Sequence, residues 1–122
     1  MFMLLLLSTL NFSSAHQGFK SVQCSNAQGH FQATRNKTDS YDLRWRVAKS
    51  AEQKTSLKKI DINDFFDPKL KQVFDVYSGG TDDLRFKVMR PETKGKVTSV
   101  TAEVTLKAPE KNLSFLECDL KL

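Results

Sequence analysis

An alternating stretch decides the fold class of this chain: Val100-Thr101-Ala102-Glu103-Val104-Thr105-Leu106-Lys107-Ala108. Apolar or small residues occupy every second position, and polar or charged residues occupy the positions between them. A β-strand sends successive side chains to opposite faces, so this pattern predicts a strand with one buried and one solvated face. Such alternation is typical of an antiparallel sheet that covers a core on one side only.

Shorter alternations occur along the rest of the chain. The clearest one, at residues 43–47, puts Trp45 on the buried face and Arg44 and Arg46 on the solvated face. Weaker or similar patterns cover residues 21–25, 30–35, 57–62, 84–88 and 113–122. Turn-forming residues separate them at 26–29, 36–40, 78–83, 91–95 and 109–112. The sequence therefore predicts an all-β fold, a small antiparallel β-sandwich or barrel with at most one short helical turn, closed by one disulfide.

The helical turn is expected after Asp67. This residue is able to cap a helix, Pro68 suits the first helical position, and Leu70, Val73 and Phe74 then follow at helical spacing.

The closing segment changes phase. Leu113 and Phe115 share one phase of the alternation, whereas Cys118 and Leu120 share the other. An extra residue in a strand produces such a change, so we expect a β-bulge or a strand start at Phe115-Leu116.

The two cysteines, Cys24 and Cys118, are predicted to form a disulfide. Both lie on the apolar phase of their segments, one near each end of the chain. An isolated pair lacks the four ligands of a structural zinc site and the Cys-x-x-Cys spacing of a redox motif. In an oxidising compartment the bond would close a loop of 118 − 24 = 94 residues.

The N-terminal segment predicts export. An apolar run through Phe2-Met3-Leu4-Leu5-Leu6-Leu7 is followed by Ser13-Ser14-Ala15, which suits signal peptidase, although no Lys or Arg precedes the run. We expect residues 1–15 to be a signal peptide and residues 16–122 to be a single β domain of 107 residues in the periplasm or outside the cell, without a membrane span. The alternative is a buried N-terminal strand or helix of a cytosolic protein.

The chain is basic, with a net charge of +5. Arg44, Arg46, Arg85 and Lys87 lie on the solvated phase of their strands and are the candidate residues of a basic β-face for an anionic polymer of the cell envelope. Nucleic acid is not favoured, because the alternation turns Trp45 away from the arginines, and single-strand binding needs aromatic and basic side chains on one surface.

An acidic segment at residues 61–67 raises the question of calcium. Asp61, Asn63 and Asp64 resemble the Asp-x-Asn-Asp linker of cadherin repeats, and this resemblance implies calcium ligands. Phe65 stands where the cadherin motif has another Asn. We favour a strand end followed by capping of the turn at Pro68 and assign no metal or other cofactor.

Catalytic motifs are missing from the sequence, so we expect no enzyme and assign no catalytic residue. A small hydrolase is the alternative. Its candidate acid–base residues are the carboxylate pairs Asp82 with Asp83 and Glu117 with Asp119, together with His30. The sequons at Asn36 and Asn112 would matter only in a eukaryotic secretory pathway.

The leading expectation is a monomeric, non-catalytic binding or inhibitor-type module. The chain resembles small envelope β-barrels, such as periplasmic lysozyme inhibitors, in having few cysteines and a final strand that carries one of them. The net charge of +5 opposes an association with basic lysozymes. We therefore expect the partner to be another protein, which the sequence does not identify, or an anionic polymer of the cell envelope.

Overall fold

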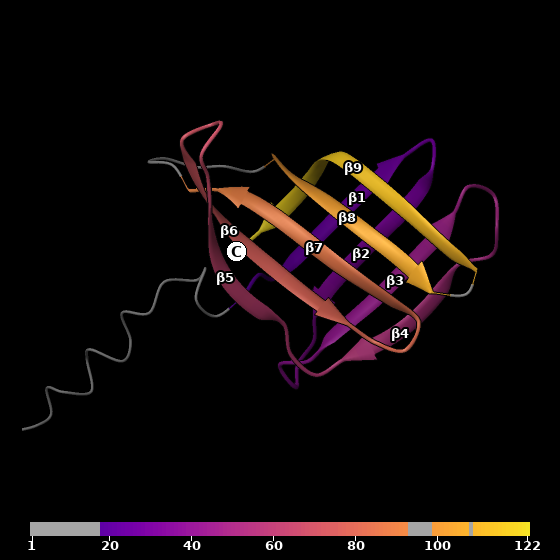
Figure 1. Ribbon diagram of the computed structural model, residues 1–122. Coiled ribbons are helices and arrows are strands. Elements are labelled where there is room, and N and C mark those ends of the chain that lie inside the picture. The colour runs from indigo at the N-terminus through magenta and orange to yellow at the C-terminus, as the bar shows by residue number, and fades with distance from the viewer. Residues whose placement is uncertain (1–17, 93–98, 108) are drawn as a thin grey trace, which may run out of the picture.

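The computed structural model describes residues 18–92, 99–107 and 109–122, which form one antiparallel sheet of nine strands (Figure 1). The strands are β1 (Ser21–Asn26), β2 (Gly29–Arg35), β3 (Tyr41–Val47), β4 (Gln53–Leu57), β5 (Asp61–Asp67), β6 (Gln72–Gly80), β7 (Leu84–Pro91), β8 (Ser99–Lys107) and β9 (Glu110–Lys121). Their order across the sheet is β4-β3-β2-β1-β9-β8-β7-β6-β5, so the first and last strands of the chain are neighbours at its centre.

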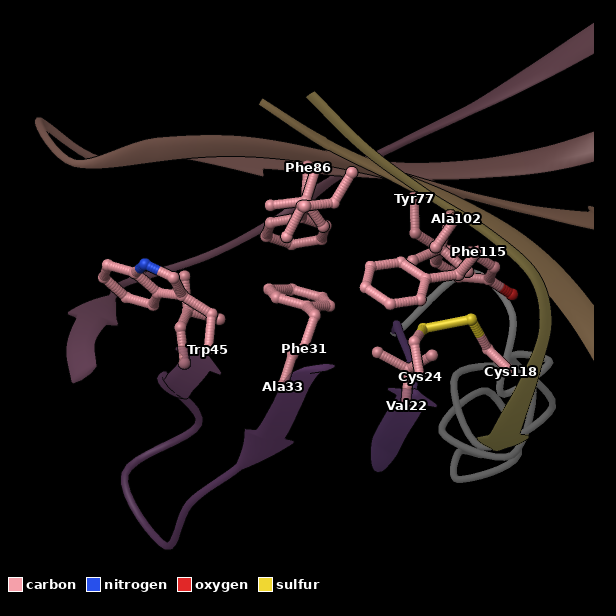
Figure 2. Packing of buried hydrophobic residues seen from close by; sticks show 14 of the residues in the cluster. Val22, Cys24, Phe31, Ala33, Trp45, Tyr77, Phe86, Ala102, Phe115 and Cys118 are labelled. Atoms are coloured by element: carbon pink, nitrogen blue, oxygen red, sulfur yellow. A yellow bond between two sulfur atoms is a disulfide. The ribbon is translucent and has the colours of Figure 1, made fainter. Parts of the chain in front are cut away.

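The sheet curls into a half-barrel, with β4-β3-β2-β1 as its first half and β9-β8-β7-β6-β5 as its second half (Figure 1). Ring contacts across the interior demonstrate the curl. Phe31 of β2 faces Phe86 of β7 with ring centroids 5.3 Å apart (Figure 2), although three strands separate β2 from β7 in the sheet order. Gly79 allows β6 to approach β4 across the interior, because a Cβ atom at this position would lie 2.6 Å from the Leu57 side chain of β4.

Alternating apolar residues supply the core. In β3, Leu43 and Trp45 are buried while Arg44 and Arg46 are exposed, as the sequence predicts. Burial of such side chains between the two halves stabilises the fold by about 1.5–3 kcal/mol for each large aliphatic or aromatic side chain.

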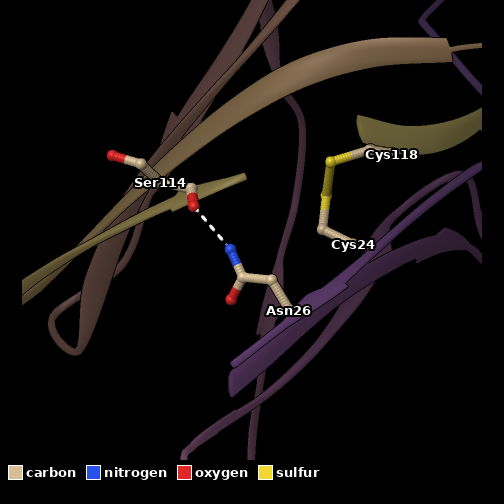
Figure 3. Close-up of a disulfide and its surroundings, with 4 residues drawn as sticks. All are labelled: Cys24, Asn26, Ser114 and Cys118. Carbon is tan, nitrogen blue, oxygen red and sulfur yellow. Dashed lines mark hydrogen bonds between the residues drawn. A yellow bond between two sulfur atoms is a disulfide. The ribbon is translucent and has the colours of Figure 1, made fainter. Parts of the chain in front are cut away.

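The central strands β1 and β9 are joined covalently. Cys24 lies directly opposite Cys118, with 4.4 Å between their Cα atoms, and the two residues form the predicted disulfide, which is buried (Figure 3). The β1–β9 ladder ends at this pair. Beyond it, the Asn26 side chain donates a hydrogen bond to the Ser114 carbonyl at 2.7 Å, and the Ser114 amide donates to the Gln28 side chain at 3.0 Å.

The ladder ends there because β9 bulges. Val100 pairs with Cys118 but Ala102 pairs with Phe115, so two steps along β8 correspond to three along β9. Leu116 and Glu117 are both exposed as a result, and Cys118 returns to the core. The bulge predicted from the change of phase is confirmed.

Four sequence-based boundaries need correction. The turn expected at residues 109–112 is mostly strand, because β9 begins at Glu110. The weak strand expected at residues 57–62 is two strands, because residues 58–60 connect β4 to β5. The expected helical turn after Asp67 is a hairpin turn: Asp67 Oδ1 accepts hydrogen bonds from the amides of Lys69 and Leu70, and Lys71 then takes a φ of 51° and reverses the chain into β6. The segment expected as a turn at 78–83 begins inside β6, which ends at Gly80.

The predicted signal peptide, residues 1–15, lies outside the described residues. In the part of the chain that the structure describes, no helix has the length and apolar character needed to cross a bilayer.

We expect Cys24→Ala with Cys118→Ala to lower the free energy of unfolding by about 4 kcal/mol, because a closed loop of this length removes much entropy from the unfolded chain. Urea denaturation of the oxidised protein and of the double variant measures the difference. Wild-type protein kept reduced should match the variant, and a loss below about 1 kcal/mol would contradict this role of the bond.

Two buried tyrosines provide a second test. The Tyr41 hydroxyl donates to the Phe19 carbonyl at 3.3 Å, whereas the Tyr77 hydroxyl has no hydrogen-bond partner among the described residues. Burial of the hydroxyl, and to a smaller extent the negative charge of Asp75, raises the pKa of Tyr77 from 10.0 to about 12. Tyr77→Phe should therefore raise the free energy of unfolding by about 1 kcal/mol, and Tyr41→Phe should lower it by a similar amount. Denaturant titrations of the two variants measure these changes, and an equal loss of unfolding free energy in both variants would contradict the prediction.

Candidate functional site

The β5–β6 hairpin carries most of the exposed apolar side chains. Among the residues whose side chains are described, four large hydrophobic residues are exposed, and three of them lie on this hairpin: Phe65, Phe66 and Leu70. Their exposed fractions are 47%, 55% and 66%. We call these three residues the hairpin cluster. Large apolar side chains that are exposed together on one element often mark an interaction site.

The strand geometry places the cluster on both faces of the hairpin. Phe65 pairs with Phe74 on the outer face, and Phe66 pairs with Val73 on the inner face. Because Phe65 and Phe66 are consecutive, they must point to opposite sides. The hairpin lies at the end of the sheet seen at the upper left of Figure 1, so Phe66 remains exposed although it lies on the inner face.

β5 is an edge strand. Among the described strands it pairs only with β6, which leaves a row of backbone N–H and C=O groups without strand partners. The strand carries three carboxylates, Asp61, Asp64 and Asp67, and no basic residue. Charged side chains of one sign on an edge repel a similar edge and attract a partner of the opposite sign.

A second group of carboxylates extends this negative charge across the inner face. Asp64 of β5 lies directly opposite Asp75 of β6, which lies opposite Arg90 of β7. Arg90 and Asp75 form a largely buried ion pair at 2.9 Å. Carboxylate oxygens of Asp64, Asp75 and Glu92 lie within 4.8 Å of one another, a spacing that suits a divalent cation. Arg90 already neutralises part of this charge, and nothing further in the described residues points to a metal ion.

The carboxylates act on one another. The negative charge of Asp75 is the main reason why the pKa of Glu92 is raised; desolvation, a hydrogen bond with Asp75 and the charge of Asp64 add to the rise, while Arg90 opposes it. Sequence reasoning did not single out Asp75, Arg90 or Glu92. Only the register of β5, β6 and β7 brings them together, and no local motif signals that register.

The structure separates the four residues of the expected basic face. Arg44 and Arg46 lie on β3, whereas Arg85 and Lys87 lie on β7, with four strands between β3 and β7. All four side chains are exposed, on the outer surfaces of the two halves of the curled sheet. Each pair also has an acidic neighbour: Arg44 lies 3.8 Å from Glu52, which also contacts His30 at 3.3 Å, and Lys87 lies opposite Glu103.

The candidate residues of a small hydrolase fall into two places. His30, Glu117 and Asp119 line a depression of about 490 Å³ over β1, β2 and β9. Asp82 and Asp83 line a different pocket, at the end of the half-barrel. The residues considered for acid–base chemistry therefore do not converge on a single site.

Glu92→Gln should raise the melting temperature at pH 7, because it removes a charge that Asp75 and Asp64 repel. When the pKa of a carboxyl group is higher in the folded than in the unfolded protein, ionisation of that group lowers the free energy of unfolding. The cost is complete above the raised pKa and disappears as the pH falls through that pKa toward the ordinary value of 4.5. The advantage of the variant should therefore vanish in acid. Thermal melts between pH 3 and pH 8 measure this, with Glu117→Gln on the bulge as a charge-matched control; a pH-independent difference would contradict the assignment.

Comparisons with protein-family models, with curated proteins and with solved structures found no match to this chain. Its function is therefore inferred from its own residues and their arrangement.

Proposed function

We propose that this protein is an exported, non-catalytic protein-binding module and that the β5–β6 hairpin is its binding element. The observation that carries the proposal is the concentration of three exposed large hydrophobic residues, Phe65, Phe66 and Leu70, on one hairpin at the edge of the sheet. The fold does not need these side chains for its core, which consists of other residues.

The two phenylalanines support this proposal, because aromatic residues, Phe among them, are enriched at protein interfaces. Phe65 and Phe66 point to opposite faces of the hairpin, so a partner that covers both must enclose the strand edge or its end. Burying both aromatic rings would supply several kcal/mol of favourable free energy before the cost of association is subtracted.

The charge of the surface defines the chemistry of the partner. β5 is acidic, with Asp61, Asp64 and Asp67, in a chain whose net charge is +5. A partner with basic residues next to an apolar surface would be attracted to this edge and repelled by the basic remainder of the chain. Complementary charge of this kind orients two proteins during their encounter.

Export is part of the proposal. The Cys24–Cys118 disulfide is consistent with an oxidising compartment. The apolar run before Ala15, followed by small residues, supports secretion through a cleaved leader into the periplasm or the extracellular space.

The test compares three oxidised, immobilised proteins: wild type, Phe65→Ser with Phe66→Ser, and Leu116→Ser. Leu116 is 81% exposed on the β9 bulge, away from the hairpin, so its variant is a matched loss of exposed apolar surface. Extract from the cell envelope is applied, salt at about 0.5 M removes charge-only binders, and denaturant elutes the rest.

Wild type and Leu116→Ser should retain one discrete protein through the salt step, and the double variant should bind the purified partner about 10–100-fold more weakly. Circular dichroism and melting temperature establish that the double variant is folded. Equal retention by all three proteins would exclude the hairpin. Release of polyanions alone at the salt step would instead favour the basic residues on β3 and β7.

A further inference from the structure

A pocket lies at the end of the half-barrel away from the β5–β6 hairpin. Three connections meet there, namely β3–β4, β6–β7 and β8–β9, which lie along the right side of Figure 1. The pocket volume is about 520 Å³. Small-ligand sites are typically about 300–1,000 Å³ and often lie at the mouths of β-barrels.

The floor of this pocket is apolar and comes from both halves of the sheet. Trp45 and Val47 of β3 contribute from one side, and Leu106 of β8 and Pro109 contribute from the other. Figure 2 shows Trp45 at one end of the row of packed core side chains. Trp45 and Leu106 are each only 6% exposed and belong to the packed core, whereas Pro109 lies in the β8–β9 connection.

Two adjacent carboxylates, Asp82 and Asp83, give one side of the pocket a negative charge. Their turn is held in place: the Asp83 amide donates to the Thr81 hydroxyl at 3.1 Å, and the Lys107 amide donates to the Asp83 carbonyl at 3.1 Å. The Lys107 ammonium donates to the Thr81 carbonyl at 2.9 Å. Among the described residues that line the pocket, Lys111 is the only basic one.

We propose that this pocket binds a small organic amine with an aromatic or alicyclic body. The ammonium group pairs with Asp82 and Asp83, and the apolar body lies against Trp45, Val47 and Leu106. An anion of the same shape is excluded by the two carboxylates. This site is separate from the hairpin cluster, so either proposal stands without the other.

The protein contains a single tryptophan, so the fluorescence of Trp45 reports on the pocket directly. Three probes with a shared phenyl body differ only in their polar group: phenethylamine is a cation at pH 7, 2-phenylethanol is neutral, and phenylacetate is an anion. Each is titrated into the full oxidised protein while Trp45 emission is recorded, and calorimetry measures the same affinities independently.

Phenethylamine should change the emission saturably and bind at least about tenfold more tightly than 2-phenylethanol, whereas phenylacetate should bind most weakly. Asp82→Asn with Asp83→Asn should abolish the preference for the amine and leave the affinity for the alcohol unchanged. Asp39→Asn with Asp119→Asn removes two exposed carboxylates elsewhere and should leave all three affinities unchanged.

Ser50→Lys keeps the test decisive if the double Asp variant does not fold. Ser50 is exposed and lines the pocket, so a lysine there should weaken amine binding and strengthen phenylacetate binding. The proposal is overturned if wild type shows no saturable change with the amine, if the anion binds as well as the amine, or if neither set of pocket variants alters the order of the three probes.

Discussion

The pairing of β1 with β9 is the constraint on which the rest of the structure depends. These strands come from the two ends of the described chain and occupy the centre of the sheet, so they join the half that begins the chain to the half that completes it. The Cys24–Cys118 disulfide makes the junction covalent, and the Asn26 and Gln28 side chains continue it past the point where the bulge in β9 ends the ladder. Contact between Phe31 and Phe86 then depends on this junction, because each ring belongs to a different half.

The same arrangement explains why exposed apolar surface gathers at one edge. Central strands are covered on their inner face by the opposite half of the sheet, whereas the end of the β5–β6 hairpin is not. Phe66 is therefore exposed although it lies on the inner face, and Phe65 is exposed on the outer face. Asp61, Asp64 and Asp67 give this edge a negative charge, which discourages pairing between two copies of the acidic edge and leaves it suited to a basic partner.

The two proposed surfaces lie at opposite ends of the half-barrel and differ in kind. The hairpin cluster exposes apolar side chains on both faces of the hairpin, next to the Asp64–Asp75–Glu92 carboxylates. The pocket at Trp45 is concave, has a largely apolar floor and presents carboxylates on one side. Exposed aromatic side chains on a protruding hairpin suit a protein partner, whereas a concave apolar floor with few polar groups suits a small molecule.

By itself, the sequence determined the features that depend on the order of residues within one strand. Alternation identified the inward direction of Trp45 and the outward direction of Arg44 and Arg46, the change of phase after Phe115 identified the bulge, and an isolated pair of cysteines identified the disulfide. Local patterns carry this information because side-chain direction follows from backbone geometry alone.

The tertiary structure alone decided which segments became neighbours. It placed Asp64, Asp75, Arg90 and Glu92 together, put four strands between β3 and β7, and gathered Trp45, Asp82 and Leu106 around one pocket. It also made a β-strand of Val73 and Phe74, whose spacing favours a helical turn, because pairing with β5 and β7 outweighs a weak local preference. Contacts between distant segments are set by the free energy of the whole packed sheet, which no single stretch of residues encodes.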